Sequence, residues 1–506
     1  MKPTLKLKSY RIWTICFLSF FAALTYNEVN LKQLPKEKVR ANQTIKTNDD
    51  YSYLVPPKNF IKKGTWVADG KSEQAHYFRP PGYGIIYLGI MKITGTTHAL
   101  AILKLLQLLL FSFSVYWFYY LLNAITNHNG LSLFVSGIYG LSPFCSGFLF
   151  YTLTEGVTPS LSLLNVFLLF KAFKSDYTPK KNLFYFSAAF VFSFLFIIRP
   201  ALGVLSLLLP FFIYKEYWHI SITKTFSKLL FFGTIAFSLM GVWQIRNYTI
   251  SNKIVGLNPI YDTQKPSLYR PPFKAYWKLT GGWAEKGHIT HSVMFPFWIS
   301  AINGDTNTAH IDNILKTYPD FVIAHFGKKR LSSILSKYQT VISNQQEAYL
   351  TRNLLPKEMP ALEKELTNDI EQLLIEYKRN FWFQYYIISP LKIFKTMAFH
   401  SNLSFYMLQH TYRGNLFIEA IRIFFFFLHS ACFLGIFISL FLRNHLNWKV
   451  IIVNLTVLTY LLFLCYYQRG LEERYTSPIL PFLLIGLSAT LKSLYDLKLI
   501  KNKIAS

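Results

Sequence analysis

The sequence predicts an all-α protein with about ten membrane-spanning helices and an α-rich region outside the membrane. Apolar residues make up 52% of the 506 residues and aromatic residues 18%, whereas only 15% are charged. Apolar runs of about 20 residues, the length that crosses a bilayer as a helix, recur along the chain. The number and length of these runs argue against a soluble enzyme with buried helices, and the mean hydropathy of +0.26 agrees.

The first helix is expected at residues 12–26, after a short basic segment at residues 1–11. A cleaved signal peptide would show the same pattern. We expect an uncleaved helix, because the polar motif that follows needs an anchor beside it. Residues 83–93 are apolar but too short to cross a bilayer, which predicts a helix lying on the membrane surface. Further spans are expected near residues 99–123, 131–151, 156–173, 183–198, 201–214, 229–245, 417–442, 450–467 and 475–491.

These segments divide the chain into three regions. Residues 1–246 form an N-terminal transmembrane module whose first external loop, residues 27–82, carries an acidic motif. Residues 247–415 form a large external region, and residues 416–506 hold the C-terminal transmembrane helices. Within the external region, residues 360–377 predict an amphipathic helix with one apolar face. That face consists of Leu362, Leu366, Ile370, Leu373 and Leu374.

Charge and cysteine content narrow the possible partners. The net charge of +28 suits a membrane protein that faces anionic lipid headgroups or a lipid phosphate. We recognise no nucleic-acid-binding module, and expect no nucleic-acid partner. The four cysteines lie inside apolar runs without the spacing of metal ligands, so we expect neither zinc nor disulfides. They are Cys16, Cys145, Cys432 and Cys465.

The distribution of Lys and Arg in the short loops predicts the orientation. Placing the N-terminus in the cytoplasm puts most of the lysine-rich short loops on the cytoplasmic side. The loop at 123–130 lacks Lys and Arg, and the first external loop is itself basic, but loops that approach 60 residues obey this rule poorly. In this orientation the polar motif of the first external loop and those at the span ends fall on one side, the external one. They occur at residues 48–51, 154–156, 199–200, 243–248 and 469–475.

Ionisable residues at the ends of spans are costly unless they are paired or hydrated, which makes them candidates for function. Arg199, Arg246 and Arg474 could instead extend to lipid headgroups, and the Asp49-Asp50 pair could simply cap a helix or form a turn. Carboxylates and arginines on one side would suit transfer of a group from an acidic leaving group to a hydroxyl. A carboxylate accepts the hydroxyl proton, and arginines hold the phosphate and its developing charge.

The order of these motifs resembles the GT-C superfamily of membrane glycosyltransferases. It is most similar to bacterial enzymes that use polyprenyl-phosphate sugars, such as the aminoarabinose and galacturonic acid transferases, and to protein O-mannosyltransferases. The resemblance covers most of the chain apart from residues 261–346. It is carried by Asp49-Asp50-Tyr51, Arg79-Pro80-Pro81-Gly82-Tyr83, Thr154-Glu155-Gly156, Arg199-Pro200, Trp243 to Tyr248, and Glu473-Arg474-Tyr475 with Pro478 and Pro481.

The resemblance implies a GT-C-like bundle and an inverting transfer in one displacement, without a covalent sugar–enzyme intermediate. The first-loop acid is the family's catalytic base, which we assign to Asp49 with Asp50 in support, and Glu155 should line the same cavity. Many relatives have Asp-Glu where this chain has Asp-Asp, so which carboxylate does what stays open. The donor phosphate and substrate would be bound by His76, Arg79, Arg199, Arg246, Glu473 and Arg474.

The implied partners are a polyprenyl-phosphate-linked sugar donor, a glycan, lipid or protein acceptor, and membrane lipids. The implied location is a bacterial inner membrane, with the active site on the periplasmic side. We expect no cofactor: metal use varies in the superfamily, and the sequence contains no cluster of ligands that would argue for a divalent metal.

Two other functions remain open. A polysaccharide polymerase or ligase of the cell envelope has a similar number of spans, but would depend on arginine and histidine in later loops rather than on Asp49 and Asp50. A lipid or sugar transporter would carry charge near the middle of the membrane and often an inverted repeat. We find no repeat, and the charged motifs lie at the membrane interface.

Overall fold

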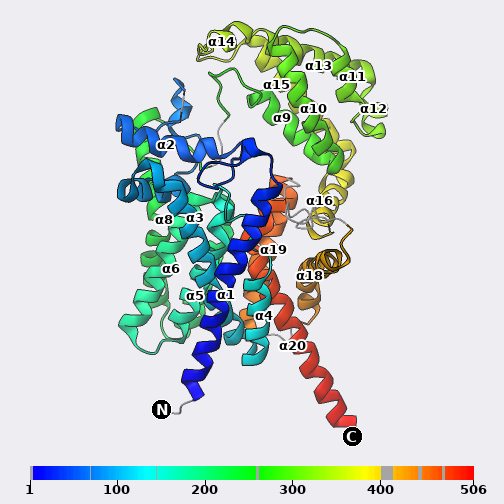
Figure 1. The fold of residues 1–506 in the computed structure, drawn as a ribbon. Helices are drawn as coiled ribbons and strands as arrows, with labels where there is room; N and C mark the ends of the chain where they lie inside the picture. Colours follow the sequence, from blue (N-terminus) through cyan, green and yellow to red (C-terminus); the bar gives the residue numbers. More distant parts are fainter. Residues whose placement is uncertain are drawn as a thin grey trace.

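The structure, a computed structural model, describes residues 4–68, 70–143, 145–257, 261–399, 414–442, 447–469 and 473–505. Over these residues every named element is a helix, and the β-structure is limited to isolated bridges that join Ile45 to Val39 and to Tyr151. A bundle of long helices carries both chain termini at one end, and a separate group of shorter helices covers the opposite end (Figure 1). The predicted all-α fold is confirmed.

Within the described residues, seven helical segments are long and apolar enough to cross a membrane. They make this an integral membrane protein. They belong to α1 (Thr4–Gln33), α3 (Gly82–Thr126), α6 (Thr178–Ile198), α8 (Ile222–Ser251), α18 (Leu416–Phe441), α19 (Trp448–Phe463) with η8 (Leu464–Gln468), and η9 (Glu473–Ile479) with α20 (Leu480–Ala505).

Three further segments that we expected to be spans form shorter helices in the same bundle. They are α4 (Asn129–Leu141), α5 (Thr158–Lys174), and the pair η4 (Pro200–Leu207) and α7 (Leu208–Tyr217). Local sequence explains two of the three, because Ser142-Pro143 ends α4 and Pro200 opens a tighter 3₁₀ turn before α7. Apolar composition alone does not reveal such interruptions.

The segment predicted to lie on the membrane surface is the first part of α3. The helix is broken at Gly95, whose φ of +74° is a conformation that glycine adopts without steric cost. The break separates residues 82–94 from the long span that follows. Before α3, the first loop forms η1 (Lys36–Lys38), α2 (Asp50–Lys63) and η2 (Glu73–His76) at the same end of the bundle as the group of shorter helices (Figure 1).

The region predicted to be external, still called the external region below, has a hydrophobic core of its own, built from residues between Leu268 and Tyr385. The predicted amphipathic helix forms α15 (Ala361–Asn380), and four of its five predicted apolar positions are buried, with Leu362 partly buried at the edge. Inside this region Arg270 makes two hydrogen bonds of 2.7 and 2.6 Å to the buried carboxylate of Glu363. The other helices are α9 (Pro271–Thr280), η5 (Gly281–Trp283), α10 (Glu285–Ile302), α11 (Ala309–Leu315), α12 (Asp320–Phe326), α13 (Lys328–Ser343), α14 (Gln346–Leu350), η6 (Gln384–Ile388) and α16 (Ser389–Phe399).

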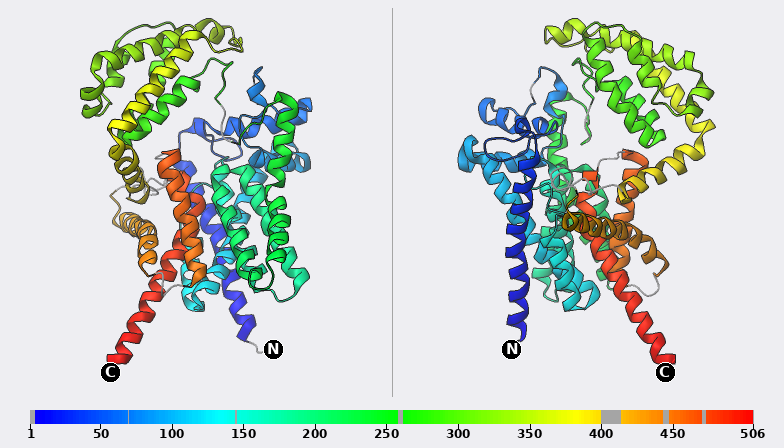
Figure 2. Two further views of the ribbon diagram at one scale, coloured as in Figure 1. Left: turned by 180° about the vertical axis from the view of Figure 1, so that it is seen from behind. Right: turned by 45° about the vertical axis from the view of Figure 1, so that its right-hand side comes forward.

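Arg469 joins this external region to the bundle. It follows η8 in a left-handed conformation, and its guanidinium donates to the carbonyl oxygens of Gly281 and Tyr385 at 3.3 and 3.1 Å. It also lies 3.8 Å from the centre of the Tyr385 ring. The helices of the external region stand above the bundle, at the end opposite the chain termini, and α18 is strongly tilted relative to the upright α1 (Figure 2).

Candidate active site

Asp49 stands immediately before α2, at the end of the bundle that faces the external region. Its carboxylate makes no capping bond to the helix. Instead, Oδ1 accepts a hydrogen bond of 3.0 Å from Arg79, and Oδ2 accepts one of 2.8 Å from Arg474. About 28% of the side chain remains exposed, so a molecule entering from outside can reach it. Capping, the simplest structural explanation of an acidic pair, therefore does not account for Asp49.

Asp50 has a different environment although it is the next residue. Successive residues of a helix point about 100° apart, and the Asp50 side chain is turned into the protein, with 6% exposed. It pairs with Arg40 and accepts hydrogen bonds from the Thr47 amide at 3.1 Å and the Thr152 hydroxyl at 2.9 Å. Asp50 thus fastens the first loop to the segment that leads to Glu155.

Glu155 lies in η3 (Thr154–Gly156) and is almost fully buried. Its Oε1 accepts a hydrogen bond of 2.8 Å from Arg199 and lies 4.0 Å from Nε of Arg474. The Thr154 hydroxyl donates to Oε2 at 3.2 Å. Arg474 is therefore shared between Asp49 and Glu155, and it joins a loop near the N-terminus to the start of the last helix.

Close backbone packing brings these segments together. A Cβ on Gly82, at the start of α3, would lie 2.6 Å from the backbone nitrogen of Ile198, the last residue of α6. Only glycine allows this approach, which places Arg79 and Arg199 at the same end of the bundle. Similarly, a Cβ on Gly156 would lie 2.4 Å from Oε1 of Gln107.

Gln107 in turn ties α3 to the segment before Glu155. Its amide nitrogen donates to the carbonyl of Leu149 at 2.6 Å, and its amide oxygen accepts from the Tyr83 hydroxyl at 3.0 Å. Both partners and Gln107 itself are buried. A buried amide that loses its partners is costly. These hydrogen bonds therefore fix the position of η3 relative to α3, and with it the position of the Glu155 carboxylate.

The arginines determine the charge state of the site. Burial acts to raise the pKa of the Asp49 carboxyl, but Arg79, Arg474 and Arg199 outweigh it and hold that pKa below its ordinary value. The same balance lowers the pKa of Glu155, with Arg199 as the larger opposing influence and Arg474 next. Both carboxylates are therefore ionised at neutral pH. Among the described side chains of this cluster, three arginines face two carboxylates, which leaves one positive charge in excess.

Aromatic rings surround the three arginines. The guanidinium of Arg79 lies 5.7 Å from the ring centre of Tyr53, and those of Arg199 and Arg474 lie 5.4 and 5.6 Å from that of Tyr475. The Tyr460 hydroxyl donates to the Tyr475 carbonyl at 2.8 Å. These tyrosines and Arg40 are not among the site residues expected from the sequence. Tyr475 follows a selected arginine directly, whereas Arg40 is one of several basic residues in its loop and carries no distinguishing signal.

Two other predicted site residues lie together in a different arrangement. Arg246 in α8 donates hydrogen bonds of 2.6 Å each to the backbone carbonyls of Trp66 and His76, and its guanidinium lies 4.6 Å from the Trp243 ring. Burial and the charge of Arg246 lower the pKa of His76, so its ring is neutral at pH 7. This pair fastens the first loop to α8. The Glu473 side chain lies outside the described residues, so its predicted role stays a prediction.

The described residues contain no group of three His, Cys, Asp or Glu side chains placed to hold a metal ion. The chemistry that the site itself offers is that of ionised carboxylates beside guanidinium groups. A carboxylate can accept a proton from a hydroxyl, and guanidinium groups bind phosphate through paired hydrogen bonds.

No family model matches this sequence, and neither does any curated protein. Among solved structures, two of ArnT from Cupriavidus metallidurans share 11% sequence identity with this chain, over 94% of its length and 76% of theirs. One is the apo state and the other is bound to undecaprenyl phosphate, with TM-scores of 0.32 and 0.33. We draw no functional conclusion from a similarity of this size.

Proposed function

We propose that this protein is a membrane glycosyltransferase that moves a sugar from a polyprenyl-phosphate donor to a hydroxyl of an envelope glycan, lipid or protein. The observation that supports it best is the ion-pair cluster in which Arg474 bridges Asp49 and Glu155. Asp49 immediately precedes α2, which lies at the same end of the helix bundle as the external region (Figure 1). A lipid-anchored donor can reach this position from the bilayer, and a polar acceptor can reach it from outside.

The arginines would bind the donor phosphate. The excess positive charge of the cluster favours an anion, and Nε of Arg79 is buried without a hydrogen-bond partner among the residues that the structure describes. An unpaired buried donor is costly, and a phosphate oxygen would satisfy it. Arg199 and Arg474 would stabilise the charge that develops on the leaving phosphate as its bond to the sugar breaks.

Asp49 would be the general base. The acceptor oxygen forms a bond to the anomeric carbon while the bond from that carbon to the phosphate oxygen breaks. The electron pair leaves with the phosphate, and the acceptor proton passes to the Asp49 carboxylate. The transfer is a single displacement with inversion. Asp49, more exposed than Glu155 and Asp50, is the carboxylate that an acceptor can approach.

The donor would also activate this base. Two arginine contacts make Asp49 a weak base, because they stabilise its ionised form. A bound phosphate would compete for Arg79 and Arg474, draw their hydrogen bonds away and raise the basicity of Asp49. Proton abstraction would then be efficient only when the donor is in place. Asp50 and Glu155, held by Arg40 and Arg199, would keep the loop and the phosphate-binding arginines in position.

We infer that the reaction takes place on the periplasmic side of a bacterial inner membrane. This follows from the predicted orientation, in which the first loop and the external region lie outside. The lysine-rich short loops and the shared position of the two termini at the other end of the bundle support it (Figure 1).

The purified protein in detergent should release polyprenyl phosphate from the polyprenyl-phosphate sugar that is its donor. The reaction should require an added acceptor, an extract of envelope glycan, lipid or protein. A panel of donors would be supplied, and both products measured by mass spectrometry. Asp49→Asn should abolish release, while Asp312→Asn, an exposed carboxylate of α11, should not change it. An Asp49→Asn variant with full activity would favour a polymerase or ligase. No turnover with any donor, together with bound or transported lipid, would favour a transporter.

A further inference from the structure

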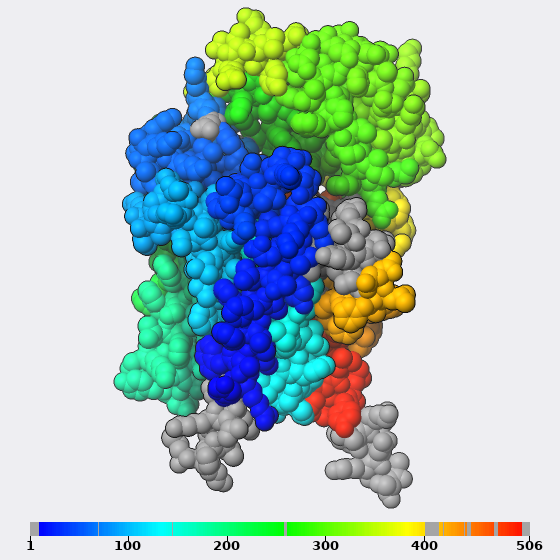
Figure 3. Space-filling view, viewed as in Figure 1, coloured from blue at the N-terminus to red at the C-terminus, as the bar shows by residue number. Residues whose placement is uncertain are grey.

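A second candidate binding site lies in the part of the bundle near the chain termini, away from Asp49 and Glu155. It is a cavity of about 350 Å³ between α4, α18 and α20. In the space-filling view α4 and α20 meet at the surface in this part of the molecule, below α18 (Figure 3). The volume falls within the range of about 300–1,000 Å³ that is common for ligand sites.

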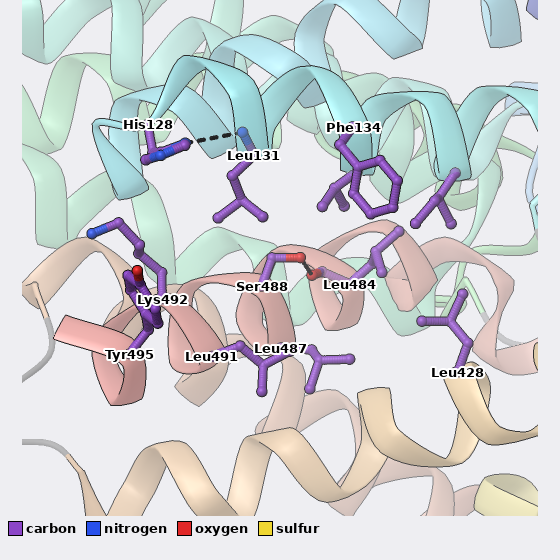
Figure 4. Close-up of a pocket in the computed structure, with 12 residues that line it drawn as sticks. His128, Leu131, Phe134, Leu428, Leu484, Leu487, Ser488, Leu491, Lys492 and Tyr495 are labelled. Carbon is purple, nitrogen blue, oxygen red and sulfur yellow. Dashed lines mark hydrogen bonds between the residues drawn. The ribbon is translucent and has the colours of Figure 1, made fainter. Parts of the chain in front are cut away.

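Hydrocarbon side chains form most of the cavity wall. Leu487 and Leu491 of α20 and Leu428 of α18 belong to two of the membrane-capable segments, and Phe134 lies opposite on α4 (Figure 4). Phe134 is 69% exposed and Leu491 56% exposed, so this wall opens toward the lipid rather than into the core. Water gains little from an apolar cavity, whereas a hydrocarbon chain gains dispersion contacts along the whole wall.

Polar groups gather at one end of the cavity only. Figure 4 shows His128, Lys492 and Tyr495 at this end, and Phe134 and Leu428 at the other. Nδ1 of His128 accepts a hydrogen bond of 3.0 Å from the Leu131 amide, so the proton of the neutral ring is on Nε2, which can donate. The end of the cavity therefore offers N–H donors from a lysine and a histidine and an O–H donor from a tyrosine.

Lys492 is the cation that lines this end of the cavity. Lys492 pairs with Asp496 at 2.5 and 2.6 Å, and that carboxylate is about half exposed. Three further lysines, Lys498, Lys501 and Lys503, follow in the sequence. Lysines that follow a membrane helix attract anionic lipid, and basic pockets between such helices bind anionic headgroups.

We propose that this cavity binds an anionic phospholipid, with one acyl chain along α20 and the phosphate beside His128, Lys492 and Tyr495. The apolar wall of the cavity matches the acyl chain of a phospholipid, and the hydrogen-bond donors and the cation at its end match the phosphate. The donor lipid of the proposed reaction does not fit here, because its phosphate has to reach Arg474 at the other end of the bundle. The bound phospholipid would brace α20, which continues directly from the segment that carries Arg474.

The test compares two lipids with identical acyl chains on the full-length purified protein. Phosphatidylglycerol should be retained through delipidation and seen by native mass spectrometry at about one molecule per protein, and it should raise the thermal unfolding midpoint. The amount of phosphatidylcholine retained should be at least tenfold lower, and its effect on the unfolding midpoint should be smaller. This comparison uses the wild-type protein and does not depend on a variant that folds.

Two substitutions then locate the site. Leu491→Trp should fill the entrance of the cavity and lower phosphatidylglycerol retention about tenfold or more. Lys492→Gln should reduce the preference for phosphatidylglycerol over phosphatidylcholine. Leu183→Trp, at a position of α6 that is 60% exposed, should leave phosphatidylglycerol retention and the lipid preference unchanged. Equal retention of the two lipids, displacement by polyprenyl phosphate, or undiminished retention in Leu491→Trp would overturn the proposal.

Discussion

Arg474 donates a 2.8 Å hydrogen bond to Asp49, a residue 425 positions earlier in the chain. The contact joins the first loop to η9, the segment that leads into the last helix. It also brings Asp49 into the same charge network as Glu155, whose Oε1 lies 4.0 Å from Nε of Arg474. The predictions below follow from this shared guanidinium and from the packing that holds it in place.

The two adjacent aspartates should behave differently when each is replaced by asparagine. Asp49→Asn removes the proposed base, so kcat should fall about 10²- to 10⁴-fold while the protein still folds. Asp50→Asn weakens a buried pair with Arg40 and should lower stability, since breaking such a pair costs about 3–5 kcal/mol. Turnover and thermal unfolding measured on both variants would show whether the two effects separate. The reverse pattern would assign the base to Asp50.

Replacing Arg474 should affect donor binding. Arg474→Gln removes charge-assisted hydrogen bonds worth about 1.5–3 kcal/mol, so the KM for the donor should rise about tenfold to hundredfold. Arg474→Lys keeps the charge but loses the planar fork, and should recover only part of the binding. Steady-state kinetics with varied donor concentration measures this. A donor KM that is unchanged in both variants would place the phosphate elsewhere.

Gly156 should tolerate no side chain. In Gly156→Ala the new Cβ would meet the amide of Gln107 at 2.4 Å, and overpacking of this kind costs about 1–3 kcal/mol. We expect a lower thermal unfolding midpoint and reduced turnover, because η3 and Glu155 would shift together. Gly137→Ala in α4 is the matched control, since nothing lies within 4 Å of its Cβ position. An unchanged Gly156→Ala protein would mean that the Gln107 contact does not position the site.

Acid should weaken the cluster. The folded-state pKa values of Asp49 and Glu155 lie below their ordinary values, so the ionised forms stabilise the fold. This contribution is fully present above the unfolded-state pKa values of about 4, and it is lost as the pH falls through the lower folded-state values. The test compares the thermal unfolding midpoint of the wild type with that of an Asp49→Asn, Glu155→Gln double variant. The difference between the two midpoints should be constant from about pH 6 to pH 8 and shrink below about pH 4. A difference that grows with acid would contradict the assignment.

The sequence alone was sufficient for the all-helical membrane fold and for the amphipathic helix α15, because both rest on composition and periodicity. It did not show where two of the predicted apolar runs are interrupted, which happens at Ser142-Pro143 and at Pro200. Hydrophobicity averaged over a window does not register how a single proline ends or tightens a helix.

For the site, the cost of ionisable residues at span ends selected Glu155, Arg199 and Arg474, and the family resemblance selected Asp49. The structure brings these together with Arg79. The same criterion selected Arg246, which instead holds the backbone carbonyls of Trp66 and His76. Burial cost marks an arginine as paired but does not say whether its partner is a carboxylate, a backbone carbonyl or a ligand. That distinction needs coordinates, and the pairing of Arg40 with Asp50 was missed for the same reason.

A density map of the purified protein with polyprenyl phosphate bound tests the central claim most directly. We predict a phosphate within hydrogen-bonding distance of Arg474 and of Arg79 or Arg199, with the Asp49 carboxylate released from at least one of its two arginines. A phosphate bound elsewhere, with the contacts of Asp49 to Arg79 and Arg474 both intact, would contradict the account.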